Sequence, residues 1–235
     1  GAWRRRLNVS LVKGGAFLMD YKYIDMDTYK RKDHFAYFSS LAYPYVGLTS
    51  NVDITDWLGR LKSRGLPFFL SACYCAVRAA NRVPAFRQRI LEGRIIEFDR
   101  CIASYTVALE DGTFCFCTLE EDLPYLDYLE YLAEGARAQE AAVKNPRIEE
   151  SADDVFINLS KYYISSLPWV SYTALVQPVP MPADSTPRIT WGKYFTQEGK
   201  ILLPVSVLCH HALVDGAHIA AFYQALDKEL AEVPV

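Results

Sequence analysis

The spacing of apolar residues predicts five helices. Two of the segments start with a helix-favouring residue, Thr28 in one and Pro67 in another. The segment that starts at Pro67 is apolar on nearly every side, which indicates a buried helix, whereas the last two have a single apolar face. The helices are expected at residues 28–41, 53–65, 67–83, 122–144 and 215–230.

Strands are predicted where apolar and polar residues alternate or form short apolar runs. Asp111-Gly112 and Glu198-Gly199 favour hairpin turns between neighbouring strands, and the proline-rich residues 178–187 indicate a loop. The order of elements predicts one α/β domain with an antiparallel or mixed sheet. The strands are expected at residues 45–54, 94–98, 101–109, 112–119, 169–177, 188–195 and 200–211.

Length and composition narrow the possible functions. The chain has 235 residues, of which 51% are hydrophobic and 23% charged, as in an ordinary folded domain. The formal net charge of -3 does not favour a general nucleic-acid-binding protein. No apolar stretch approaches the roughly 18 residues needed to span a membrane, so no membrane partner is expected.

The cysteines and the N-terminal residues bear on the cellular compartment. The six cysteines lie mostly in apolar runs and lack Cys-x-x-Cys spacing, so they are expected to be reduced core residues of a cytoplasmic protein. The first residues are basic and the apolar stretch after them is broken by Lys13 and two glycines, which does not fit a signal peptide. Residues 1–19 are therefore predicted to be an extension or an expression remnant, and residues 20–235 a single domain.

Three of the four histidines fall within residues 207–218, between an apolar strand and the last helix. Adjacent strand residues point to opposite faces, so Cys209, His210 and His211 cannot all reach one metal ion, and no metal site is expected. One interpretation is a set of hydrogen-bonded core histidines. The alternative is catalytic, because His211 stands where the strand ends, Asp215 can cap the next helix, and imidazole suits proton transfer near neutral pH.

The segment HHALVDG at residues 210–216 resembles the His-His-x-x-x-Asp-Gly signature of CoA-dependent acyltransferases. Further segments are similar to chloramphenicol acetyltransferase: YKRKDHF (29–35) to its Trp-x-Arg-Lys-Glu-His-Phe, and ISSLPWVSYTAL (164–175) to its Ser-Ala-x-Pro-Trp-Val-Ser-Phe. Residues 189–218 resemble its C-terminal third almost continuously. Other members of the superfamily fit less well, since condensation domains are much longer and the cores of 2-oxo acid dehydrogenase acyltransferases lack these Arg and Pro-Trp segments.

The resemblance implies an α/β fold of the chloramphenicol acetyltransferase type, with a mixed sheet flanked by helices. It implies acetyl transfer from acetyl-CoA to a hydroxyl of chloramphenicol, which confers antibiotic resistance. In this family no acyl-enzyme forms: the second histidine of the signature, here His211, takes the proton of the hydroxyl that attacks the thioester. The family is homotrimeric with active sites between subunits, so His211 of one chain would face Ser165 and Thr190 of its neighbour. The aromatic content of 14% agrees with an oligomer.

Other polar residues correspond to groups in the family's active site. Asp215 corresponds to a buried carboxylate paired with an arginine, here Arg31, although the charge run around Arg31 is also typical of a solvated helix face. Ser165 corresponds to a serine that donates to the oxyanion, Ser166 would replace it if the register shifts by one, and a turn residue is the alternative. Thr190 corresponds to a threonine that supports the intermediate through ordered water, and is otherwise an ordinary strand residue.

The resemblance makes acetyl-CoA the co-substrate and a small-molecule alcohol the acceptor. Lys193 and Tyr194 align with a Lys-Tyr pair near the CoA nucleotide. A cation suits phosphate and an aromatic ring suits adenine. These two residues are therefore expected to bind the co-substrate.

The expected acceptor pocket departs from the family pattern. Phe38 stands where the family has tyrosine, Pro44 replaces cysteine, Ala108 replaces phenylalanine and Gln177 replaces leucine. The last two changes would make the pocket larger and more polar. Residues 145–163, from which the family draws another pocket phenylalanine, do not align. Two alternatives stay open: an acetyltransferase for a different small alcohol, and a small-molecule binding protein of the same fold with weak turnover.

Overall fold

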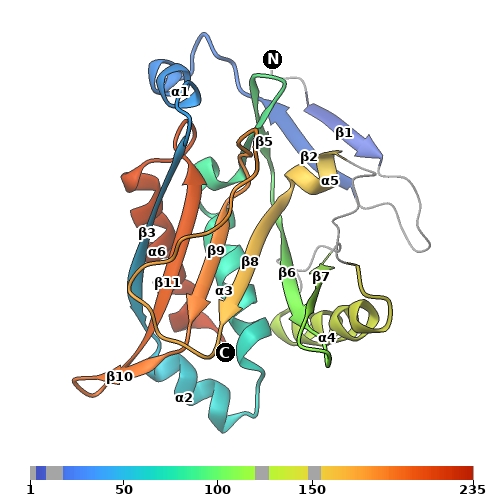
Figure 1. Ribbon diagram of the computed structural model, residues 1–235, viewed down its shortest axis with the longest axis vertical. Helices are drawn as coiled ribbons and strands as arrows, with labels where there is room; N and C mark the ends of the chain where they lie inside the picture. Colours follow the sequence, from blue (N-terminus) through green and yellow to red (C-terminus); the bar gives the residue numbers. More distant parts are fainter. Residues whose placement is uncertain (1–3, 9–17, 120–126, 148–154, 235) are drawn as a thin grey trace.

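The computed structural model describes residues 4–8, 18–119, 127–147 and 155–234, which form two β-sheets and the helices around them (Figure 1). The smaller sheet is antiparallel, with strand order β1-β2-β5-β4. Its strands are β1 (Arg4–Asn8), β2 (Leu18–Tyr23), β4 (Gln88–Leu91) and β5 (Arg94–Phe98). Because β1 pairs with β2, part of the predicted N-terminal extension belongs to a sheet, and the domain boundary at residue 20 stays a prediction.

The larger sheet has the strand order β10-β11-β9-β8-β6-β7, and β3 pairs with β11. The pairs β6–β8 and β8–β9 are parallel and the others are antiparallel, so the sheet is mixed, as expected. Its strands are β3 (Tyr45–Asp53), β6 (Ile102–Ala108), β7 (Phe114–Thr118), β8 (Lys161–Leu167), β9 (Arg188–Gly192), β10 (Phe195–Gln197) and β11 (Lys200–His210).

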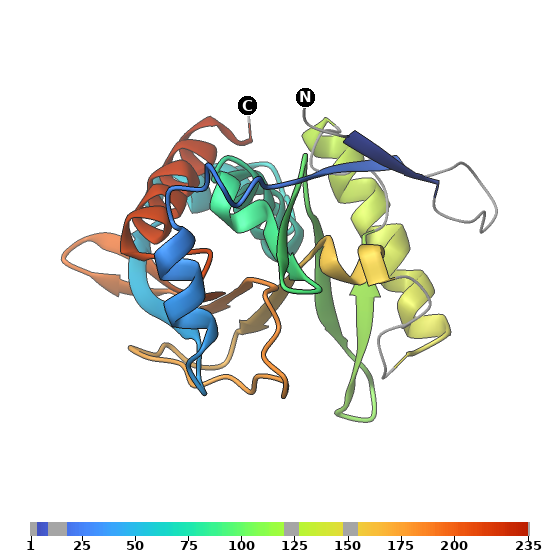
Figure 2. The same ribbon diagram turned by 90° about the horizontal axis from the view of Figure 1, so that it is seen from above.

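Helices cover one face of the larger sheet, and the loop of residues 168–187 runs along the other face (Figures 1 and 2). The strand residues that point toward the helices are apolar and buried, among them Ile189, Trp191, Val205 and Val207. We call the opposite side the loop face. The helices are α1 (Lys32–Ser39), α2 (Thr55–Ser63), α3 (Phe68–Asn81), α4 (Tyr128–Lys144), α5 (Val155–Leu159) and α6 (Gly216–Glu232), with a 3-10 turn at Pro84–Arg87.

Most of the predicted elements are confirmed, with some shorter than expected. Gly65 has a φ of +62° just beyond α2, as a helix-ending glycine should. Gly112 (φ +83°) turns the hairpin between β6 and β7, and Glu198 and Gly199 both adopt positive φ between β10 and β11. The helix predicted at 28–41 is limited to α1, and the one predicted at 122–144 begins at Tyr128, its first residues lying outside the described ranges.

The strand predicted at residues 169–177 is wrong. This segment alternates in polarity, but it lies over the loop face as irregular chain, because β8 and β9 already have neighbouring strands on both edges. The strand predicted at 188–195 is interrupted at Lys193 and Tyr194, so that β9 and β10 are separate strands. Strand β8, at the centre of the larger sheet, was not predicted, because its sequence KYYISSL does not alternate.

The six cysteines are free and buried, in agreement with their expected place in the core. No helix within the described ranges has both the length and the apolar character that crossing a bilayer requires.

Candidate functional site

His211 occupies a corner where β11 has ended and the chain turns toward α6. Its backbone N–H donates to the carbonyl of Pro44 (2.8 Å), and its own carbonyl accepts from the guanidinium of Arg31 (3.2 Å). Its imidazole lies flat on the ring of Phe38, with ring centroids 3.6 Å apart and planes 9° apart. The backbone of His211 is thus held by Pro44, just before β3, and by Arg31, just before α1, while its ring is held by Phe38 of α1.

The two ring nitrogens of His211 have different surroundings. Nδ1 is buried and has no hydrogen-bond partner among the described residues. A general base must present one nitrogen to the substrate. With Nδ1 enclosed, Nε2 is the nitrogen through which this ring can reach a hydroxyl.

Asp215 joins this corner to the last helix. Its carboxylate forms an ion pair with Arg31, so the predicted pair exists although the two residues lie far apart in sequence. The same carboxylate caps α6 by accepting from the N–H groups of Ala217 (3.0 Å) and His218 (3.5 Å). Burial acts to raise the pKa of Asp215, but the charges of His218 and Arg31 hold it below its ordinary value.

His210 points away from this corner, as the alternation of strand side chains requires. It is 5% exposed, and its Nδ1 accepts from the backbone N–H of Ala212 (3.3 Å). Burial lowers its pKa, while the nearby carboxylate of Asp184 acts to raise it. These contacts fit a structural role for His210.

Ser165 and Thr190 meet on the loop face of the sheet. They are register partners on β8 and β9, and their hydroxyl oxygens are 2.8 Å apart. Ser166 is paired in register with Trp191, whose side chain is buried, so it faces the core side. The geometry therefore favours Ser165 over Ser166 as the partner of Thr190.

Within one chain, Ser165 and His211 are far apart. Ser206 is the register partner of Thr190 on β11, and His210 follows it by four strand residues, about 14 Å. Ser165 lies two strands to the side of Ser206, about 5 Å per strand. Figure 1 shows the same separation, with β11 ending near α1 and β8 and β9 ending at the opposite end of the sheet.

The other predicted site residues are divided between these regions. Phe38 and Pro44 are at the corner, where both contact His211. Lys193 and Tyr194 follow β9, and the ring of Tyr194 lies near Phe68 and the ammonium group of Lys62.

Two of the predicted acceptor-pocket residues lie on other segments of the chain. Ala108 is exposed at the end of β6, and Gln177 is half-buried in the loop of residues 168–187.

Comparisons with known proteins show the family of this chain. The sequence model of the family described as chloramphenicol acetyltransferase matches residues 19–227. The chain belongs to this family. It is 31% identical to a chloramphenicol acetyltransferase of Clostridium perfringens over 218 residues, covering 91% of this chain and 95% of the relative. It is also 31% identical to chloramphenicol acetyltransferase 2 of Escherichia coli over 211 residues, covering 88% of this chain and 96% of the relative.

Solved structures confirm the fold. A chloramphenicol acetyltransferase structure superposes with a TM-score of 0.80 at 24% identity, covering 88% of this chain and 98% of the other. A dihydrolipoamide acetyltransferase of Azotobacter vinelandii superposes with a TM-score of 0.63 at 20% identity, covering 85% of this chain and 86% of the other. The family match confirms the expected family and an acyltransferase as the class of enzyme, and the superpositions confirm the α/β fold.

The corner at His211 is supported by a polar cluster that the sequence did not suggest. Arg188 forms two hydrogen bonds to the carboxylate of Asp184 (2.9 and 3.0 Å), and the hydroxyl of Tyr45 donates to the same carboxylate (3.0 Å). Tyr45 is the register partner of His210 and follows Pro44 in the chain. Asp184 lies in a proline-rich loop and Arg188 begins a strand, so neither position gave a signal in the sequence.

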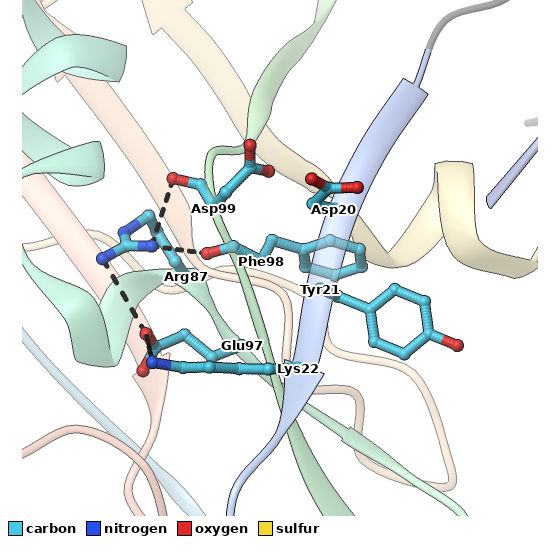
Figure 3. A pocket seen from close by; sticks show the side chains of 7 residues that line it. All are labelled: Asp20, Tyr21, Lys22, Arg87, Glu97, Phe98 and Asp99. Carbon is cyan, nitrogen blue, oxygen red and sulfur yellow. Dashed lines mark hydrogen bonds and ion pairs between the residues drawn. The ribbon is translucent and has the colours of Figure 1, made fainter. Parts of the chain in front are cut away.

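A separate pocket of about 280 Å³ lies in the smaller sheet (Figure 3). Its charged groups largely satisfy one another: Arg87 donates to the carbonyls of Phe98 (2.5 Å) and Asp99 (3.1 Å), and Lys22 pairs with Glu97 (3.1 Å). None of the predicted site residues lines this pocket. Among the described residues, no three His, Cys, Asp or Glu side chains are grouped as a metal site requires.

Proposed function

We propose that the protein transfers the acetyl group of acetyl-CoA to a hydroxyl of chloramphenicol, with His211 as the general base. The observation that carries this proposal is the corner at His211, where the ring is stacked, the backbone is held by Pro44 and Arg31, and Nδ1 is enclosed. A histidine with only a structural role would not need Nδ1 enclosed and Nε2 left to reach a substrate. Membership of the chloramphenicol acetyltransferase family supports both the reaction and the acceptor.

The chemistry follows from the two regions of the site. Nε2 of His211 takes the proton of the acceptor hydroxyl while its oxygen bonds to the thioester carbonyl carbon, which gives a tetrahedral oxyanion. The hydroxyl of Ser165 donates to this oxyanion, and Thr190 holds that serine and supports the intermediate. When the carbon–sulfur bond breaks, the imidazolium returns its proton to the thiolate, and the products are an acetyl ester and free CoA. Lys193 and Tyr194 bind the nucleotide part of the co-substrate.

The active site is formed between subunits of a homotrimer. The separation of Ser165 from His211 within one chain supports this arrangement, since His211 must reach the acceptor hydroxyl while Ser165 reaches the oxygen of the thioester carbonyl that this hydroxyl attacks. Exposed apolar side chains occur in both regions: Tyr37 and Tyr43 near the corner, Trp169 and Val176 along the loop face. Such surfaces are typical of subunit contacts.

A different small alcohol is the second candidate acceptor. Phe38 places a ring without a hydroxyl directly against His211, and the methyl group of Ala108 leaves space where the family has phenylalanine. A binding protein with weak turnover is less well supported, because Arg31, Asp215, Ser165 and Thr190 are all paired as catalysis requires.

Thiol release from acetyl-CoA, followed with DTNB, tests the proposal. Wild type should release thiol only when chloramphenicol is present, His211→Ala should release almost none, and the matched control His34→Ala, an exposed histidine of α1, should retain wild-type rates. If only another alcohol supports His211-dependent release, the acceptor is different. If no alcohol in a broad panel does so, the protein is a binding protein and the proposed reaction is refuted.

Subunit complementation tests the shared site. His211→Ala and Ser165→Ala subunits are each expected to be nearly inactive. After mixed refolding, some interfaces would combine the intact His211 of one chain with the intact Ser165 of another, so activity should return. Absence of recovery in verified mixed oligomers would contradict an active site between subunits.

A further inference from the structure

A row of hydroxyl side chains crosses the loop face of the larger sheet. Thr49 on β3, Ser206 on β11, Thr190 on β9 and Ser165 on β8 are successive register partners. We call these four residues the hydroxyl row. Thr49 and Ser206 are joined by a hydrogen bond of 2.6 Å, and Thr190 and Ser165 by one of 2.8 Å. The hydroxyls of Ser206 and Thr190 are not hydrogen-bonded to each other directly, so the row consists of two pairs.

The hydroxyl of Tyr172 connects the two pairs. It accepts a hydrogen bond from Ser206 Oγ (3.2 Å) and donates one to the backbone carbonyl of Thr190 (3.1 Å). Because Ser206 donates its proton to Tyr172, the Thr49 hydroxyl must be the donor in the hydrogen bond between Thr49 and Ser206. The hydrogen bonds therefore run in one direction, from Thr49 through Ser206 and Tyr172 to Thr190.

The segment around Tyr172 is fastened to the end of β9. Val170 accepts from the N–H of Lys193 (2.8 Å), and the hydroxyl of Ser171 donates to the Lys193 carbonyl (2.6 Å). The ring of Tyr172 lies against Gly192, where a Cβ would come within 2.8 Å of it. Tyr172 is therefore held at two places, by its hydroxyl at the Thr190 carbonyl and by its ring against Gly192.

The hydroxyl of Tyr172 is the group that a phenylalanine at this position would lack. Phenylalanine fills the same space against Gly192 but can bond neither Ser206 nor Thr190. The link between the two pairs thus depends on a single oxygen atom of this chain.

We propose that Tyr172 is a positioning residue for acetyl transfer, which holds Thr190 and through it orients the Ser165 hydroxyl toward the oxyanion. This inference rests on the proposed function of Ser165. Ser165 is half-buried, and the only hydrogen-bond partner of its hydroxyl among the described residues is Thr190, so the orientation of this hydroxyl depends on where Thr190 is held. An oxyanion donor is effective only when it is already aimed at the developing charge.

Kinetics of Tyr172→Phe, Ser165→Ala and the double variant test the inference. Loss of a hydrogen bond of ordinary strength predicts a fall in kcat of about fivefold for Tyr172→Phe. The KM for acetyl-CoA should stay unchanged, because the nucleotide contacts are not altered. In the Ser165→Ala background the same substitution should have almost no further effect, since the hydroxyl that it positions is gone.

Tyr223→Phe is the matched control. Tyr223 is on α6, one of the helices that cover the sheet opposite the loop face (Figures 1 and 2). Its hydroxyl donates to the backbone carbonyl of Val205 on β11 (2.6 Å) and also lies 3.4 Å from that of Leu48 on β3. Its loss removes a tyrosine–carbonyl hydrogen bond next to Ser206 without touching the hydroxyl row, so kcat per folded enzyme should not change. An unchanged kcat in Tyr172→Phe, or an equal loss with and without Ser165, would overturn the inference. If Ser165→Ala itself retains full activity, the proposed function of Ser165 fails instead.

Discussion

Replacing Asp215 with asparagine or with alanine separates its two roles. Asparagine caps a helix about as well as aspartate, so Asp215→Asn removes the charge opposite Arg31 but keeps the cap on α6. Asp215→Ala removes both the charge and the cap. The side chains of Asp215 and Arg31 are 33% and 17% exposed, so their pairing lies between a surface ion pair and a buried one.

The expected magnitudes follow from this partial burial. Asp215→Asn should lower the free energy of unfolding by about 1–2 kcal/mol, less than removal of one partner from a fully buried pair. Asp215→Ala should lower it by about 1 kcal/mol more, the usual contribution of an N-cap. The kcat of Asp215→Asn should fall about ten- to a hundredfold, because the guanidinium that bonds the His211 carbonyl loses its anchor.

Urea unfolding and DTNB kinetics measure the two effects, and Asp127 provides the control. Asp127 caps α4 by accepting from the Leu129 N–H (2.8 Å) and has no ion pair among the described residues. Asp127→Asn should therefore change little, while Asp127→Ala should lose about 1 kcal/mol. Equal urea midpoints for the two Asp215 variants would refute the capping argument, and a wild-type kcat in Asp215→Asn would refute the positioning argument.

The ion pair between Asp215 and Arg31 should also make the stability of the protein depend on pH in a defined direction. Although burial opposes the effect, the charges of His218 and Arg31 keep the folded-state pKa of Asp215 below its ordinary value. Its contribution to stability is therefore complete above the unfolded pKa of about 3.9 and is lost as the pH falls through the lower folded pKa. The stability difference between wild type and Asp215→Asn should shrink at acid pH, and a constant difference down to full acid unfolding would contradict this assignment.

Three further predictions concern other parts of the fold. Glu229 is fully buried between two arginine guanidiniums, so Glu229→Gln should destabilise the chain by about 3 kcal/mol in urea unfolding while kcat per folded enzyme is retained. Gly192→Ala should displace the Tyr172 ring, because the new Cβ would come within 2.8 Å of it, and should lower kcat without a positive-φ penalty. Burial and, less strongly, the nearby Asp20 raise the pKa of Asp99, so Asp99→Asn should raise the melting temperature at pH 7, and this gain should vanish at pH 3. The opposite sign in any of these would contradict its stated cause.

The strongly periodic segments could be predicted from sequence because their cause is local. Helix α3 is apolar nearly throughout, and β11 carries a long apolar run that ends at paired histidines. The turns at Gly112 and Glu198-Gly199 contain positive φ angles, for which their glycines are suited. The role of Asp215 as an N-cap could also be predicted, because a cap bonds to residues two and three positions away.

Segments whose state depends on distant partners could not be predicted. Residues 169–177 alternate like a strand, but no strand edge is free beside them, so they lie across the sheet instead. Strand β8 lacks a strong pattern and exists because β6 and β9 pair with it on both sides.

The sequence by itself determined the candidate residues: the corner histidine, its carboxylate and arginine, and the Ser-Thr pair. Only the tertiary structure decided their grouping, because strand register places Ser165 opposite Thr190 and well away from His211. The tertiary structure also brought four further residues into contact with these regions, through hydrogen bonds that join different segments of the chain: Tyr172, Ser206, Asp184 and Arg188. A side chain's type is local information, whereas its partners across a sheet are set by the folding of the whole chain.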